Sequence, residues 1–280
     1  MGATADTIWG VPAYLPYLQP ALTDEAVALA EEEIGYRLPK DYLNLLRKQN
    51  GGYIRYSLPE NVHDMIAGIG PHFPSLTGFD WEACQEQVSY PLRGLVPFDG
   101  DGHWHLCLDY RRDSRSPSIT HADIECDEEI HIAESFAAYL GLLRVRVDDE
   151  YVLEAVSDIE TVKASLSVQL GVEFEPPDTI AHGYPIQRAR LGTDQYRNPE
   201  WVWISPNTVP RGFVRNNDPR YSELKDLMPG FAERFPELPA SSYILTASDG
   251  VRAKVLDACN RAGLLARPLR GYVVGHLTNG

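Results

Sequence analysis

The chain has 280 residues and a formal net charge of -15, from 40 acidic and 25 basic side chains. Hydrophobic residues make up 44% and charged residues 23%, which is the composition of a globular protein rather than of a long disordered chain. The excess of carboxylates disfavours nucleic acids and anionic membranes as partners, because contacts to phosphate need stripes of Lys and Arg. It favours rapid encounter with a basic protein, although negative charge also serves solubility alone.

No stretch approaches the roughly 18 uninterrupted apolar residues of a membrane-spanning helix. Residues 1–7 lack the basic and apolar regions of a secretory signal, so we expect a cytoplasmic protein. The four cysteines form no CxxC pair, which disfavours a structural zinc site. We expect incidental or buried thiols and no cofactor; the cysteines are Cys84, Cys107, Cys126 and Cys259.

The N-terminal segment predicts an extended arm followed by two helices. Three prolines resist a helix over residues 8–20. Thr23 can cap the free amides of a first helix, which Gly35 ends. Pro39 suits the first turn of a second helix. Asn50-Gly51-Gly52 ends that helix and turns the chain, since these residues accept positive φ cheaply.

The following residues predict antiparallel strands. Apolar segments indicate strands over residues 53–56, 65–70, 95–98, 103–110 and 118–124, with a short helix over 80–88. Asp99-Gly100-Asp101-Gly102 has the composition of a hairpin turn. Residues 125–129 predict another turn, and Ser135 caps a closing helix. The first half therefore predicts an α+β layer pattern.

A domain boundary is expected near Val147-Asp148-Asp149-Glu150. It would separate a first domain, residues 1–146 with its N-terminal arm, from a smaller α+β domain, residues 147–280, whose role is open. Residues 1–146 hold 22 acidic and 11 basic side chains, and residues 147–280 hold 18 and 14. The negative charge therefore concentrates in the first half.

The second half predicts alternating helices and strands without an internal repeat. Amphipathic spacing indicates helices over residues 153–171, 221–235 and 250–263, the second broken near Pro229-Gly230. Strands are expected over residues 201–204 and 243–247, a loop over 206–219, and a return toward the sheet over 264–277.

Three phrases of the first half, read in order, resemble the SMI1/KNR4 family, also called the SUKH superfamily. The first runs from Leu38-Pro39 through Tyr42 to Asn50-Gly51-Gly52. The second runs from Pro97-Phe98 to Gly102 and on to Leu108-Asp109. The third comprises Ile119-Thr120-His121 and Ala133-Glu134-Ser135-Phe136. The resemblance covers about residues 20–146. Three phrases in the right order are more specific than any one phrase alone.

The resemblance implies a SUKH-like antiparallel or mixed sheet packed with helices. Bacterial members of the family are mostly immunity proteins, which bind and neutralise polymorphic toxins that are often nucleases or deaminases. Fungal members regulate cell-wall synthesis through protein contacts. Neither role implies catalysis. The expected partner is therefore a basic toxin domain, and a non-enzymatic regulatory scaffold is the alternative; the oligomeric state stays open.

The candidate partner-binding residues are carboxylates and aromatic side chains near the predicted sheet. Carboxylates can fill a cleft that attracts phosphate with Lys and Arg, and aromatic residues dominate binding hot spots. The set comprises Asp99, Asp101, Trp104, Asp109, Tyr110, Asp123, Glu125, Asp127, Glu128 and Glu129. The competing interpretation is that the acidic residues form solvated turns and the aromatic ones belong to the core.

A metal-dependent hydrolase is the second alternative. His103 and His105 alternate on a strand and could bind a metal ion together with Asp109, but one His pair without a clear third ligand is a weak pattern. No nucleophile elbow and no phosphate-binding glycine loop is present in the sequence.

Overall fold

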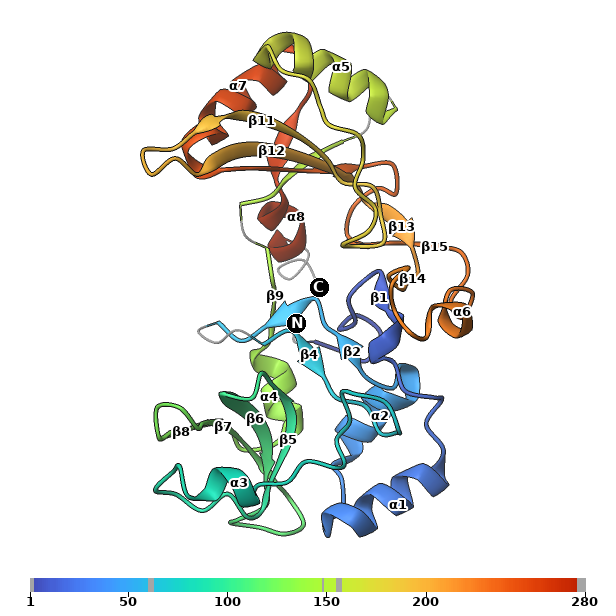
Figure 1. Cartoon of the computed structure of the whole chain (residues 1–280), viewed down its shortest axis with the longest axis vertical. Helices are drawn as coiled ribbons and strands as arrows, with labels where there is room; N and C mark the ends of the chain where they lie inside the picture. Colours follow the sequence, from blue (N-terminus) through green and yellow to red (C-terminus); the bar gives the residue numbers. More distant parts are fainter. Residues whose placement is uncertain (1–2, 60–62, 148, 155–157, 276–280) are drawn as a thin grey trace. The chain divides into compact units, whose positions relative to one another are not determined.

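The computed structural model describes residues 3–59, 63–147, 149–154 and 158–275. The chain divides into two compact units, residues 1–146 and 147–280, called here the first and the second unit. Both mix helices with sheets (Figure 1), which confirms the α+β class at this coarse level.

Two helices of the first unit begin at the capping residues that the sequence indicates, whereas the helix expected over residues 80–88 is confined to Glu82–Gln85. Thr23 Oγ1 accepts a hydrogen bond from the Ala26 amide at 3.1 Å, and Gly35 ends that helix with φ of 76°. Ser135 caps the closing helix in the same way. The helical segments are η1 (Leu15–Tyr17), α1 (Asp24–Ile34), α2 (Lys40–Lys48), α3 (Glu82–Gln85) and α4 (Phe136–Leu142).

A four-stranded antiparallel sheet forms the other half of this unit. Its spatial order follows the chain: β5 (Leu95–Gly100), β6 (Trp104–Asp109), β7 (Ser118–Asp123) and β8 (Glu128–Ala133). Two short ladders lie outside it, β2 (Gly52–Tyr53) with β4 (Met65–Ile66) and β3 (Tyr56–Ser57) with β9 (Arg144–Val145). β1 (Ala13–Tyr14) lies in the N-terminal arm.

Side chains cover both faces of this sheet. One face joins the main core with the helices, which includes Tyr42, Phe98, Leu106, Phe136 and Tyr139. The other face packs against the segment that precedes β5, in a smaller cluster of Tyr90, Leu92, Leu95, Cys107, Ala122 and Ile124. β6 is therefore buried on both sides, and only its first residue, Trp104, is partly exposed.

The turn after α2 requires glycine for two physical reasons. Gly51 has φ of 89°, and a Cβ at this position would lie 2.6 Å from the Gly68 amide nitrogen. The Asn50 side chain accepts from the Ile69 amide at 2.9 Å and donates to the Ile69 carbonyl at 2.9 Å. The first sequence phrase thus encodes a close approach between two backbone segments.

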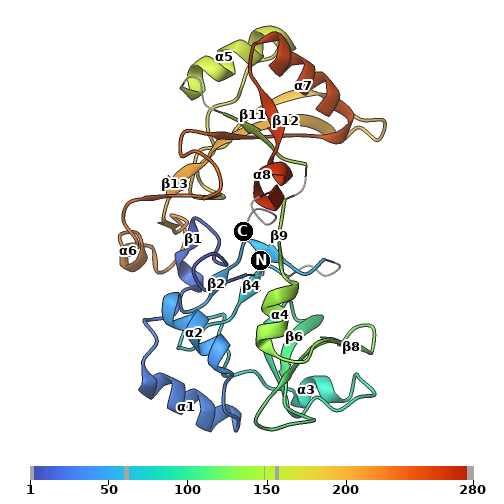
Figure 2. The same cartoon turned by 180° about the vertical axis from the view of Figure 1, so that it is seen from behind.

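The second unit is a five-stranded antiparallel sheet with helices α5 and α7 packed on one face (Figures 1 and 2). Its strand order is β11, β12, β16, β10, β17, which gives βαββαβ connectivity with β11 added at the edge. The core elements are β10 (Tyr151–Leu153), α5 (Ile159–Leu170), β11 (Gln187–Thr193), β12 (Pro199–Pro206), β16 (Tyr243–Ala247), α7 (Arg252–Arg261) and β17 (Ala266–Pro268).

Smaller elements complete the second unit: β13 (Thr208–Pro210), β14 (Gly212–Phe213), α6 (Tyr221–Leu224), β15 (Phe231–Glu233), η2 (Asp249–Val251) and α8 (Leu269–Gly275). β13 pairs with β15. Among the residues that the structure describes, no helix combines the length and apolar character needed to cross a membrane.

Other expected elements also differ from the structure. The loop expected over residues 206–219 contains β13 and β14. The helix expected over residues 153–171 begins at Ile159, after the capping residue Asp158, because Tyr151–Leu153 pairs in the sheet; residues 155–157 lie outside the described part. The helix expected over residues 221–235 is confined to Tyr221–Leu224, and Phe231–Glu233 forms a strand instead. The turn expected over residues 125–129 ends earlier, because β8 already begins at Glu128.

Candidate functional site

Two acidic turns lie at the same end of the β5–β8 sheet. One connects β5 to β6 around Asp101, and the other connects β7 to β8 over residues 124–127. The register pairs Trp104 with Asp123, and the Ile124 amide donates to the His103 carbonyl at 2.7 Å. The sheet therefore gathers carboxylates that are far apart in the sequence.

We call this group the acidic end. Asp101, Glu125, Asp127 and Glu128 are exposed, and Asp123 is half-buried. Asp123 Oδ1 accepts from the Cys126 amide at 2.8 Å, which closes the second turn. Asp127 has φ of 53°, a conformation that Asp tolerates in turns, and its Oδ1 accepts from the Ser89 amide at 2.6 Å. Backbone bonds thus hold the turn that presents these carboxylates.

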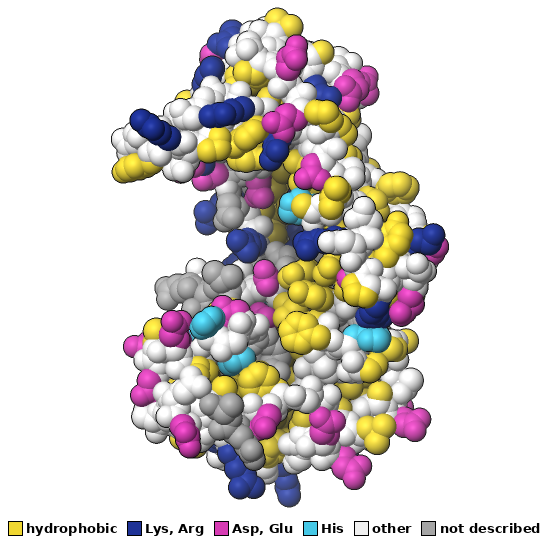
Figure 3. Space-filling model, viewed as in Figure 1, with side chains coloured by type: hydrophobic (Ala, Val, Ile, Leu, Met, Phe, Trp, Pro, Cys, Tyr) yellow, Lys and Arg dark blue, Asp and Glu magenta, His cyan; other side chains and the backbone are white. Residues whose placement is uncertain are grey.

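The acidic end carries negative charge without Lys or Arg ion-pair partners in the described part of the chain. Desolvation opposes ionisation of Asp101, but hydrogen bonds from the His103 and Trp104 amides, at 2.9 and 3.2 Å, outweigh it and lower its pKa. Within the described ranges, no Lys or Arg forms an ion pair with any of the five carboxylates. Glu125 faces the exposed His103 at 3.4 Å. Figure 3 shows acidic side chains spread over the unit that carries β5–β8.

An aromatic pair lies next to the acidic end. Trp104 stacks on His121 with ring centroids 5.4 Å apart, and both side chains are half-buried. His121 in turn pairs across the ladder with Ile130, which is 48% exposed. Burial lowers the pKa of His121, against the opposing effect of Asp123. A neutral, partly apolar surface therefore adjoins the carboxylates.

Asp99, from the predicted set, is buried and belongs to the interior. Its Oδ2 contacts Nδ1 of His63, and Nε2 of His63 contacts the Tyr139 hydroxyl. All three side chains are buried. Sequence patterns did not predict this chain of contacts, because His63 and Tyr139 come from distant segments. Asp99 therefore lies outside the acidic end.

Asp109, Tyr110 and Glu129 are also engaged within the unit. Asp109 is 4% exposed and accepts from Arg111 Nη2 at 2.7 Å and from Thr120 Oγ1 at 2.8 Å. Glu129 accepts from the other terminal nitrogen of the same arginine at 2.8 Å. Tyr110 is buried and donates to the Arg37 carbonyl at 2.8 Å. Their burial or pairing leaves these three residues outside the acidic end.

The metal-binding alternative finds no geometric support in the residues it named. His103 is exposed beside Glu125, His105 is buried, and Asp109 binds Arg111. In the part of the chain that the structure describes, no group of three or more His, Cys, Asp or Glu side chains is placed to hold a metal ion.

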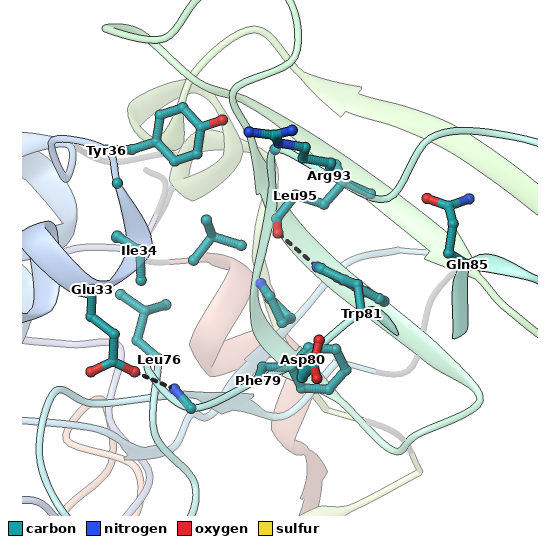
Figure 4. A pocket seen from close by; sticks show the side chains of 15 residues that line it. Glu33, Ile34, Tyr36, Leu76, Phe79, Asp80, Trp81, Gln85, Arg93 and Leu95 are labelled. Atoms are coloured by element: carbon teal, nitrogen blue, oxygen red, sulfur yellow. Dashed lines mark hydrogen bonds between the residues drawn. The ribbon is translucent and has the colours of Figure 1, made fainter. Parts of the chain in front are cut away.

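A large groove in the first unit escaped the sequence reasoning. It encloses about 810 Å³ between the end of α1, the loop before α3 and the start of β5. Figure 4 shows two hydrogen bonds in its wall, from the Gly78 amide to Glu33 and from Trp81 Nε1 to the Leu95 carbonyl, both 2.9 Å long. Tyr36 and Arg93 lie at one end of the groove. The closely spaced aromatic residues of Phe79-Asp80-Trp81, which line the groove, were the feature of the sequence that could have indicated it.

The second unit has a cavity of its own, of about 400 Å³. The Arg234 guanidinium lies 4.6 Å from the Tyr184 ring centroid and donates to Ser205 Oγ at 2.8 Å. Glu150 and Asp178 also line this cavity, so it carries charges of both signs.

Residues 21–141 match the SMI1 / KNR4 family (SUKH-1). This match confirms the resemblance noted in the sequence, and it falls within the first unit. No curated protein matches the chain. The SMI1/KNR4 region contains the β5–β8 sheet, the acidic end and the Trp104–His121 pair, whereas the second unit lies beyond it.

Proposed function

We propose that this protein is a cytoplasmic immunity protein, which binds a basic domain of a bacterial polymorphic toxin and covers its active site with the acidic end. The SMI1/KNR4 match supports the proposal, because immunity proteins are common in that family. The observation that carries it is structural: five carboxylates converge at one end of a sheet without a Lys or Arg partner among the described residues.

The charge distribution suits a nuclease or another nucleic-acid-modifying toxin. Such enzymes attract phosphate with Lys and Arg, and an inhibitor that supplies carboxylates satisfies the same cations. Opposite charges accelerate encounter, and salt weakens that effect. The Trp104–His121 pair adds a partly apolar contact, which slows dissociation once water is excluded.

Protection of cells provides the test. A toxin domain encoded beside this gene is expressed together with the full-length chain or with a variant in which Asp101, Glu125, Asp127 and Glu128 become their amides. The wild type is expected to restore growth and to co-purify with the toxin domain, and the variant is expected to do neither. A wild-type chain that binds and blocks none of the neighbouring toxin domains would refute the immunity role.

The same experiment separates the regulatory alternative. A scaffold of the fungal type would bind cellular proteins that are not toxins and would leave toxin-treated cells unprotected. In this role the chain itself carries out no catalytic step.

A further inference from the structure

A second cavity in the first unit, of about 350 Å³, lies beside the β5–β6 turn. Apolar side chains form most of its wall: Met65, Phe73, Pro74, Phe79, Pro97 and Phe98. Polar groups line it at the turn: Asp99, Asp101 and His105. Because Asp101 also belongs to the acidic end, the cavity opens at the border of the proposed partner surface.

Two aromatic residues of this cavity are accessible, whereas Phe98 is buried. Phe73 is 79% exposed and Phe79 is 42% exposed. Phe79 also lines the large groove described above, so the two hollows meet at this ring. Exposed rings at the mouth of a cavity offer faces on which a planar or apolar group can stack.

The polar end of the cavity retains negative charge. Asp101 uses Oδ1 for both backbone amides, which leaves Oδ2 without a hydrogen-bond partner among the described residues. His105 does not neutralise it, because burial lowers the pKa of this imidazole against the opposing fields of Asp101 and Asp99. His105 is 4% exposed, and its Nε2 makes no hydrogen bond within the described ranges.

We propose that this cavity receives an arginine side chain of the protein partner, with the guanidinium at Asp101 and the aliphatic stem between Phe73 and Phe79. This inference rests on the immunity function proposed above and names the anchor by which the partner is recognised. A guanidinium suits the site better than an ammonium group, because it is planar, stacks on aromatic rings and offers several donors in a fixed geometry.

A small probe tests the anchor without any toxin. The isotope-labelled full-length chain is titrated with N-acetyl-arginine methylamide and, in parallel, with the corresponding lysine and leucine compounds, and NMR spectra are recorded. The arginine probe is expected to shift the ring signals of His105 and the amide signals of Asp101 and Gly102 at millimolar concentration. Equal shifts with the leucine or lysine compound, or no shift at all, would overturn the proposal.

Substitutions locate the effect. Asp101→Asn keeps an oxygen acceptor for the turn but removes the charge, and it is expected to weaken binding of the arginine probe at least about tenfold. Asp113→Asn is the matched control, since Asp113 is exposed and also accepts a backbone amide, from Arg115 at 2.8 Å. Phe73→Ala should weaken binding, whereas Phe231→Ala, which removes a ring 71% exposed in the second unit, should not.

The protection assay and the titration with the arginine probe can fail independently of each other. A chain that binds the arginine probe but protects against no toxin refutes the immunity role alone. A chain that protects cells but ignores the probe, or that responds equally to Asp101→Asn and Asp113→Asn, refutes the arginine anchor alone.

Discussion

Trp104 of β6 stacks on His121 of β7, with ring planes inclined by 18°. The pair lies on neighbouring strands at the end of the sheet where the carboxylates gather, since Trp104 is paired in register with Asp123. An aromatic centre beside a charged rim is the arrangement from which protein interfaces draw most of their binding energy.

Trp104→Ala is expected to weaken binding of the cognate toxin domain by about 30-fold or more, as for other aromatic hot spots. Calorimetric titration measures the change. Trp201→Ala removes another half-buried strand tryptophan, from the second unit, and should leave the affinity unchanged. Equal effects of the two substitutions would show that the Trp104 face is not the contact.

Asp99→Ala is expected to destabilise the first unit by about 3 kcal/mol, because it leaves His63, which also contacts Tyr139, buried without its carboxylate partner. Asp101→Ala, two residues along the same turn, should cost about 1 kcal/mol, the scale of a lost cap. Hydrogen exchange of residues 95–140 in the full-length chain measures the loss of stability in the two variants. A larger loss for Asp101→Ala would contradict the assignment of Asp99 to the interior.

The stability of the first unit should fall in acid partly through Asp109. Desolvation opposes its ionisation, but hydrogen bonds from Arg111 and Thr120 outweigh that effect and hold its pKa below the ordinary value of 3.8. The ionised form is thus favoured by folding, so its contribution is present above pH 3.8 and disappears as the pH falls through the lowered pKa. Urea denaturation at several pH values should show a weaker acid dependence in Asp109→Asn, and an unchanged profile would refute this role.

Gly51→Ala should disrupt the turn after α2, at a cost of about 3 kcal/mol or more, because strain at positive φ adds to a clash with the Gly68 backbone. Gly35→Ala has a similar φ of 76° but no atom near the added Cβ, so about 1 kcal/mol is expected. Thermal unfolding of both variants gives the comparison. Similar melting temperatures would mean that the Gly68 backbone shifts at little cost to accommodate the added Cβ, which would contradict the prediction.

Local signals in the sequence predicted much of the first unit. Thr23, Gly35 and Ser135 act through atoms a few residues away, so their caps could be recognised without knowledge of the fold. The sequence did not predict β8, because it is an edge strand. Its first four residues, Glu128 to His131, are exposed, and polar residues among them resemble a solvated turn. β11 was missed for a similar reason, since charged side chains at Arg188 and Arg190 interrupt its apolar pattern.

The surface itself depends on contacts between distant residues. Asp99 and Asp101 flank one glycine, yet one is buried against His63 and the other is exposed at the cavity. The apolar pattern predicted a strand over residues 103–110, but not that Trp104 at the start of β6 is partly exposed while Tyr110, just after its end, is buried. The pairing of Trp104 with His121 follows from strand register, which the sequence alone did not reveal.

The salt dependence of toxin binding tests the central claim most directly. The cognate toxin domain is titrated into the full-length chain at about 50 mM and about 500 mM salt, which changes the screening of exposed charges. We predict that amide substitution of Asp101, Glu125, Asp127 and Glu128 lowers the affinity at least about 100-fold at low salt and removes most of its salt dependence. The same substitution of four exposed carboxylates elsewhere in the first unit, Glu25, Glu32, Asp41 and Asp113, should leave most of the affinity intact. Equal losses in the two variants, or wild-type affinity in the first, would contradict the account.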